Sequence, residues 1–350
     1  MTILEKNKKI PPWLMPAALT LAGALVIATS PWLFSQERWV MDDPHRREHV
    51  FTLIADGDHL VRGAQNGTLR IRDRDGWHRL GQSPGQAAIM LLLPERELAV
   101  LNRGLWHWGT PAPVAAPDGV RISHAAPKGE QLVLGTAKGV LLWDGHEFHD
   151  LGLDAQVYRV HVVQTGAGKG IHAGAIATGM WHRPEGGDWR PNNPGLPQPV
   201  NALSLLQVDN GVLLAGTDQG LFWQSAPGEQ WRRVDAGLGQ RRVLALALDT
   251  DGWLWAGSDD GAYRVRLVQR AQAVETQGRW EKLRNPPGGL DRPVSWVVPL
   301  GDETWISAGS VYRLDHRAGP HLYQQFAVGL LLIALALYLL RRNMMGRDNG

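Results

Sequence analysis

One segment sets the pattern for the whole chain: Leu248-Asp249-Thr250-Asp251-Gly252-Trp253-Leu254-Trp255-Ala256-Gly257-Ser258-Asp259-Asp260-Gly261. Aspartate and glycine favour tight turns, whereas the bulky side chains between them favour strands. We therefore predict four short strands here, at Val243–Leu248, Trp253–Ser258, Ala262–Arg266 and Trp280–Leu283. Joined by hairpin turns, they would make one small antiparallel sheet.

The same unit recurs about every forty residues. Its marker glycines are Gly67, Gly104, Gly139, Gly179, Gly220, Gly261 and Gly309, which lie 37, 35, 40, 41, 41 and 48 residues apart. A period near forty with four short strands per unit is typical of a β-propeller blade. The sequence therefore predicts an all-β fold, a seven-bladed β-propeller. We expect the outer-strand aromatics Trp77, Phe148, Trp189 and Trp231 to pack between blades.

The units resemble the repeats of two-component-regulator sensor propellers, with Leu248–Gly261 as the closest stretch. They are also similar to propellers that assist photosystem assembly and, more distantly, to sialidase-type repeats. Ser258-Asp259-Asp260-Gly261 departs from the Asp–Gly spacing of the sialidase box. The resemblance covers most of residues 50–314. It implies a fold rather than an activity, and through the regulator family it suggests a sensory role.

The seventh unit has only three predicted strands, the last at Val311–Leu314, so its edge needs a partner. Gln36-Glu37-Arg38-Trp39-Val40 has the pattern of an outer strand. We predict that Trp39 and its neighbours complete blade seven beside Val311 and Tyr312. The alternative is that Trp39 is an aromatic residue at a membrane interface.

Two apolar segments flank the repeats. We predict one transmembrane helix at each end of the propeller, at 13–34 and 322–340, because each segment is long enough to span a bilayer. A cleaved signal peptide is the alternative for the first. The remaining predicted parts are a cytoplasmic tail at 1–12, an extracytoplasmic propeller at 36–320 and a second cytoplasmic tail at 341–350. The protein would then lie in a bacterial inner membrane, with its propeller in the periplasm and both termini cytoplasmic.

Composition narrows the chemistry. The chain has no cysteine, and its 36 Lys and Arg nearly balance 34 Asp and Glu, so a thiol nucleophile is excluded and nucleic acid is not an expected partner. We also expect no cofactor and no catalytic residue. His146-Glu147-Phe148-His149 lacks the helical spacing of a zinc motif, so we predict no metal site there. Gly166-Ala167-Gly168-Lys169-Gly170 lacks the spacing of a Walker phosphate-binding loop, so we predict that it forms a hairpin turn.

Arginines remain as candidate binding residues. The early positions of the inner strands would line the mouth of the central channel, and five arginines lie at or near such positions: Arg121, Arg159, Arg241, Arg242 and Arg292. Together they could form a rim that binds an anion or a carboxylate. The alternative is that they are solvated loop residues paired with Asp118, Asp235 and Asp291.

Three functions agree with these features. The first is a non-catalytic scaffold, assembly or accessory subunit that docks onto membrane or periplasmic proteins. The second is an extracytoplasmic module that senses a small-molecule ligand and signals through a partner, since Arg341–Gly350 is too short for an output domain. The third is a lyase or glycosidase acting from the channel, which would need paired carboxylates at one mouth.

Overall fold

The computed structural model describes residues 14–34, 37–43, 48–166, 168–283, 292–315 and 320–345. It separates into two compact units. One unit is Trp39–Leu314, and the other contains the two terminal helices. The predicted tail at 1–12 lies outside the described residues, as do residues 346–350 of the other predicted tail.

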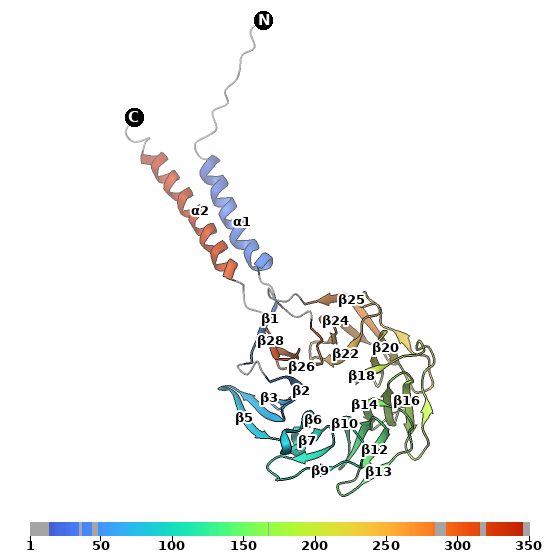
Figure 1. The fold of residues 1–350 in the computed structure, drawn as a ribbon. Coiled ribbons are helices and arrows are strands. Elements are labelled where there is room, and N and C mark those ends of the chain that lie inside the picture. Colours follow the sequence, from blue (N-terminus) through green and yellow to red (C-terminus); the bar gives the residue numbers. More distant parts are fainter. Residues whose placement is uncertain are drawn as a thin grey trace. The chain divides into compact units, whose positions relative to one another are not determined.

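The larger unit is a ring of seven four-stranded antiparallel sheets, which confirms the predicted seven-bladed propeller (Figure 1). Blade 1 contains β2 (Val50–Asp56), β3 (His59–Ala64), β4 (Thr68–Asp73) and β5 (Gly76–Gln82). Blade 2 contains β6 (Ile89–Leu93), β7 (Leu98–Leu101), β8 (Gly104–His107) and β9 (Val114–Ala115), with short 3₁₀ turns at Pro84–Gln86 and Pro94–Arg96. Blade 3 contains β10 (Ile122–Lys128), β11 (Gln131–Thr136), β12 (Gly139–Trp143) and β13 (Phe148–Asp150).

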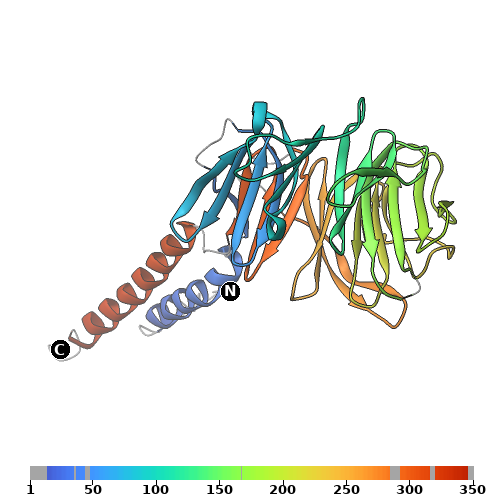
Figure 2. The ribbon, with the colours of Figure 1, turned by 90° about the horizontal axis from the view of Figure 1, so that it is seen from below.

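Blades 4 to 6 follow the same order. Blade 4 contains β14 (Val157–Val163), β15 (Gly170–Ala175), β16 (Gly179–Pro184) and β17 (Arg190–Pro191). Blade 5 contains β18 (Ala202–Gln207), β19 (Leu213–Thr217), β20 (Gly220–Gln224) and β21 (Arg232–Arg233). Blade 6 contains β22 (Val243–Leu248), β23 (Trp253–Ser258), β24 (Gly261–Gln269) and β25 (Val274–Lys282). The first strand of every blade faces the centre of the ring, and Figure 2 shows the sheets from the side.

Blade 7 is assembled from both ends of the domain. Its strands are β26 (Trp296–Leu300), β27 (Glu303–Ser307) and β28 (Val311–Asp315), and the fourth position beside β28 is taken by β1 (Arg38–Met41). The Asp42 backbone N–H donates to the Val311 carbonyl at 3.1 Å. Trp39 is 1% exposed and packs in one cluster with Tyr312. The ring therefore has no open edge at this junction.

A buried ion pair fastens the segment after β1 to blade 1. Arg62, on β3, contacts the Asp43 carboxylate at 2.5 Å and the Glu48 carboxylate at 2.9 Å, and its side chain is fully buried. Arg70 holds the second oxygen of Glu48 at 2.9 Å. Burial lowers the pKa of Arg62, and the two carboxylates oppose that shift. The guanidinium stays charged, because arginine does not deprotonate in proteins.

The hydrophobic core is divided among the blade interfaces. Among the described residues it forms seven clusters, each shared by two neighbouring blades. Second-strand glycines permit the close approach: a Cβ on Gly216 would lie 2.6 Å from Val243 Cγ1 of the next blade. Outer-strand tryptophans add links, since the Trp231 indole N–H donates to the Asn192 carbonyl at 2.7 Å.

The second unit contains α1 (Leu14–Phe34) and α2 (Pro320–Met345), which pack against each other. Glycine makes this contact close, since a Cβ on Gly23 would lie 2.7 Å from the Gly329 carbonyl oxygen. Among the described residues, neither helix is both long and apolar enough to cross a membrane. The prediction of transmembrane spans at 13–34 and 322–340 is therefore not supported.

Candidate functional site

A cavity of about 420 Å³ opens where the inner strands of the propeller begin. Its wall is made largely of apolar and aromatic side chains, with a few polar groups among them. The residues that matter for its chemistry are Phe51, Ser123, Tyr158, Arg159, Arg292 and Trp296. They come from blades on opposite sides of the ring, so the cavity lies on the propeller axis.

Repeated β-bulges shape this cavity. In the inner strands of blades 1 to 6, the pairing with the second strand skips one residue near the strand start. A bulge leaves the extra residue unpaired and redirects its side chain. The skipped residues are Phe51, Met90, Ser123, Tyr158, Leu203 and Leu244, and all except Leu203 line the cavity. One structural device, repeated in six blades, therefore supplies five of the residues that line the cavity.

Arg159 is the main polar group of the cavity. Its Nε–H donates to the Leu203 carbonyl oxygen at 2.9 Å, which ties blade 4 to blade 5. Its guanidinium lies over the Trp296 ring, 5.1 Å from the centroid. The Trp296 ring is itself fixed, because its Nε1–H donates to the Phe51 carbonyl at 2.6 Å. Burial lowers the pKa of Arg159, but the guanidinium remains charged at every physiological pH.

The charged side chains in the described lining of the cavity are positive. No aspartate or glutamate is among the described residues that line it, and within the described part of the chain Arg159 forms no ion pair. Arg292, which is exposed, adds a second cation to the wall. Arg159 is half-buried, and a cation that loses hydration without gaining a carboxylate partner is unfavourable in an apolar setting. The site is therefore suited to an anionic ligand.

A smaller cavity of about 140 Å³ lies deeper along the inner strands, and Arg159 lines both. His124 and His161 line this deeper cavity. Burial, followed by the Arg159 charge, holds the pKa of His124 well below its usual value, and burial also lowers the pKa of His161. Both imidazoles are therefore neutral near pH 7. The deeper cavity adds polar atoms without adding charge.

The five predicted arginines separate into two groups. Arg159 and Arg292 line the cavity, as the rim prediction requires. Arg241 lies elsewhere: its Nε is 3.6 Å from the Asp260 carboxylate, and its guanidinium lies over the Tyr263 ring. Arg121 and Arg242 are exposed and do not line the described cavity. The structure thus brings two of the five together.

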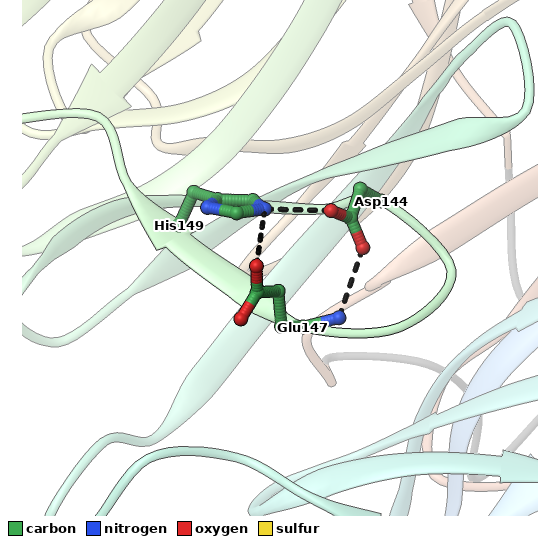
Figure 3. Close-up of side chains that lie close together, drawn as sticks. All are labelled: Asp144, Glu147 and His149. Atoms are coloured by element: carbon green, nitrogen blue, oxygen red, sulfur yellow. Dashed lines mark hydrogen bonds and ion pairs between the residues drawn. The ribbon is translucent and has the colours of Figure 1, made fainter.

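Another polar cluster lies on the turn between β12 and β13, and Figure 3 shows its three side chains. His149 Nε2 is 2.6 Å from the Asp144 carboxylate and 3.8 Å from the Glu147 carboxylate. Asp144 also accepts the backbone N–H groups of His146 and Glu147, as in many tight turns. The hydrogen bond to Asp144 raises the pKa of His149, and all three groups contact solvent. These contacts account for the cluster as a turn motif.

Comparison with known proteins identifies the fold but no family. No protein-family model matches the sequence, and no curated protein matches it significantly. Among solved structures, it is similar to the extracellular domain of a protein described as a hybrid two component system, BT4673 of B. thetaiotaomicron. The TM-score is 0.63 and the identity 16%, over 79% of this chain and 39% of that chain.

Two other propellers show how widely the fold is shared. The extracellular domain of BT3049, also from B. thetaiotaomicron and also described as a hybrid two component system, matches with a TM-score of 0.55 and 15% identity over 77% of this chain and 40% of that chain. The WD40 propeller domain of Doa1 matches with a TM-score of 0.56 and 14% identity over 80% of this chain and 95% of that chain. The match thus spans about 40% of the length of each of these two extracellular-domain chains. Likeness at this level of identity establishes the fold alone.

Proposed function

We propose that this chain is an extracytoplasmic ligand-binding propeller whose central cavity takes a small anionic molecule. The observation that carries the proposal is Arg159, a half-buried cation that lines the cavity and has no carboxylate partner among the described residues. The likeness to extracellular domains of two sensor proteins adds support for the extracytoplasmic location. In this proposal a partner protein carries the response.

The energetics favour an anion over a neutral guest. Without a ligand, the desolvation of Arg159 is offset by one carbonyl, at 2.9 Å, and by the Trp296 ring. A carboxylate or phosphate oxygen would supply charge-assisted hydrogen bonds, which are roughly twice as strong as neutral ones. The cavity volume of about 420 Å³ suits a small molecule.

A thermal-shift screen tests this proposal. The full chain is heated with small carboxylates, phosphates and neutral sugars, beside Arg159→Met and Arg242→Met. We expect a subset of anions to raise the melting temperature of the wild type and of Arg242→Met but not of Arg159→Met. The proposal fails if no anion stabilises the wild type, or if Arg159→Met responds equally.

A non-catalytic accessory subunit of a membrane or periplasmic complex is the second candidate. One observation favours it: large apolar side chains are exposed on the helix pair, including Leu21, Leu25, Leu330, Leu331 and Leu337. Exposed apolar patches of this kind mark contact surfaces. Mild extraction from native cells, followed by size determination, tests it. A stable larger complex is expected, and migration as a lone chain would contradict it.

We propose no catalytic role. A lyase or glycosidase would need two carboxylates facing one substrate, and the described lining of the cavity contains cations and neutral groups instead. The compounds that bind in the thermal-shift screen provide the test. Each is incubated with the chain and analysed by mass spectrometry, and we expect it to be recovered unchanged. Detection of a converted product would overturn this part of the proposal.

A further inference from the structure

The terminal nitrogens of Arg159 are free to bind a ligand. Nε–H is used by the Leu203 carbonyl, but the two NH₂ groups have no hydrogen-bond acceptor among the described residues. They present a planar pair of donors, which matches the two oxygens of a carboxylate. Because the guanidinium is held between Leu203 and the Trp296 ring, its plane is fixed before a ligand arrives.

Aromatic groups surround this pair of donors. Trp296, Tyr158 and Phe51 come from blades 7, 4 and 1 and all line the same cavity. The Tyr158 ring also lies near the guanidinium, with 5.7 Å between the guanidinium carbon and the ring centroid. Met90 and Leu244 extend the apolar wall. A flat ring can stack against such side chains, whereas a sugar would leave its hydroxyl groups unpaired there.

The charge count favours one carboxylate. Arg159 is the half-buried cation of the cavity, whereas Arg292 and His49, which also line it, are exposed. His124 and His161 in the deeper cavity are neutral, because burial lowers the pKa of each. Arg159 alone matches a single carboxylate, whereas the second charge of a phosphate would depend on Arg292, a solvent-exposed cation whose attraction water and salt weaken.

We infer that the central cavity binds aromatic monocarboxylates, with the carboxylate on the Arg159 NH₂ groups and the ring among Trp296, Tyr158 and Phe51. This inference rests on the proposed function, since it names the class of ligand for the same cavity. The carboxylate provides the anionic contact, and the ring replaces water against the aromatic wall. Neither part of the ligand is sufficient by itself.

Calorimetric titration of the full chain tests each part with a matched pair of probes. 2-Naphthoate carries both features, 2-naphthamide has the same shape without the charge, and acetate has the charge without the ring. We expect 2-naphthoate to bind at least tenfold more tightly than either of the other two. Equal binding of the amide, or of acetate, would overturn the inference.

Variants assign the effect to the two side chains. In Arg159→Gln, 2-naphthoate should lose its advantage over 2-naphthamide, while Trp296→Leu should weaken both probes by a similar factor. Arg242→Gln changes an exposed arginine that directly precedes the inner strand β22, and this variant should bind as the wild type does. Circular dichroism checks that each variant is folded. An Arg159→Gln protein that still prefers 2-naphthoate would contradict the inference even if folding is intact.

The outcomes separate the inference from the proposed function. If other anions bind in a manner that requires Arg159, and 2-naphthoate does not, the cavity is a ligand site but the aromatic class is wrong. If no anion binds, both fail. Preference for 2-naphthoate that is lost in Arg159→Gln supports both.

Discussion

The guanidinium of Arg159 in blade 4 lies over the indole of Trp296 in blade 7, 5.1 Å from the ring centroid. The contact crosses the propeller axis and leaves a half-buried positive charge beside apolar walls. Such a charge is expected to lower stability when no anion is bound, because burial of an unpaired ion is unfavourable.

Replacement of Arg159 by methionine should therefore stabilise the empty protein. We expect Arg159→Met to raise the free energy of unfolding by about 1 kcal/mol, since methionine fills similar space without a charge. Urea denaturation measures the change, with Arg242→Met as a neutral control. If Arg159→Met is less stable than the wild type, the contacts of Arg159 with Leu203 and Trp296 stabilise the fold by more than the charge destabilises it.

The Arg62 ion pair should be essential for closure of the ring. Arg62→Ala leaves Asp43 buried without its cation, so we expect the free energy of unfolding to fall by about 3–5 kcal/mol. Arg270→Ala removes a solvent-exposed pair with Glu275 and should change it by less than about 1 kcal/mol. Similar values for the two variants would show that the buried pair contributes little.

Second-strand glycines should resist enlargement. A Cβ on Gly257 would lie 2.9 Å from Val294 Cγ1 and overlap the Val294 carbonyl oxygen, so Gly257→Ala should cost about 1–3 kcal/mol. Gly168→Ala is the matched control, because its nearest neighbour would lie 3.7 Å away. Thermal melts of both proteins give the comparison. If Gly257→Ala has the same melting temperature as Gly168→Ala, the close approach of blades 6 and 7 does not require glycine at position 257.

His172 should make stability depend on pH. Its ring stacks on His182 with 4.6 Å between centroids, and burial lowers the pKa of His172 to about 4. Below pH 6.5 the unfolded chain binds a proton at His172 that the folded protein does not bind. The free energy of unfolding therefore falls as pH drops from about 6.5 to about 4. The full effect of this residue is about 3 kcal/mol.

Urea denaturation at pH 7 and pH 5 measures this slope. His172→Leu should reduce it, while a similar slope is expected in His146→Gln, which changes an exposed residue. Burial also lowers the pKa of His182, so part of the slope should remain in His172→Leu. An unchanged slope in that variant would contradict the assignment to His172.

His149 should titrate in the opposite direction. The hydrogen bond that the His149 ring donates to the Asp144 carboxylate raises the pKa of His149 above 6.5. The pair therefore stabilises the turn below pH 6.5, and this contribution is lost as pH rises through the folded pKa. An NMR titration of the His149 ring reports it. Asp144→Asn should bring the pKa of His149 down, and Glu147→Gln, which changes a carboxylate 3.8 Å away, should do so less. Equal pKa shifts in the two variants would show that Glu147 affects the pKa of His149 as strongly as Asp144 does.

The sequence pattern predicted the blades because turns and strands are local. In blade 6, Val243–Leu248 and Trp253–Ser258 match β22 and β23 residue for residue. The central cavity could not be predicted from the sequence in the same way, because the bulges at Phe51 and Tyr158 depend on how each inner strand pairs with its neighbour. The sequence marks no difference between Arg159, which enters the cavity, and Arg241, which turns to Asp260.

The glycine of the repeated Gly-Thr or Gly-Ser pair has a role that the pattern alone could not show. Gly216 and Gly257 lie inside second strands and face the next blade, so their lack of a side chain serves packing between repeats. Such a contact is invisible until the repeats are placed side by side. The same holds for the pairing of Asp43 with Arg62, which are 19 residues apart.

The position of β1 beside β28 affects how the chain matures during synthesis. Arg38–Met41 leaves the ribosome early, but its partner, Val311–Asp315, appears only after six complete blades have been made. Throughout that interval the first strand has no neighbour to pair with and its tryptophan is unprotected. Blade 7 can therefore be completed only after the last strand has been synthesised, which makes closure of the ring a late step of folding.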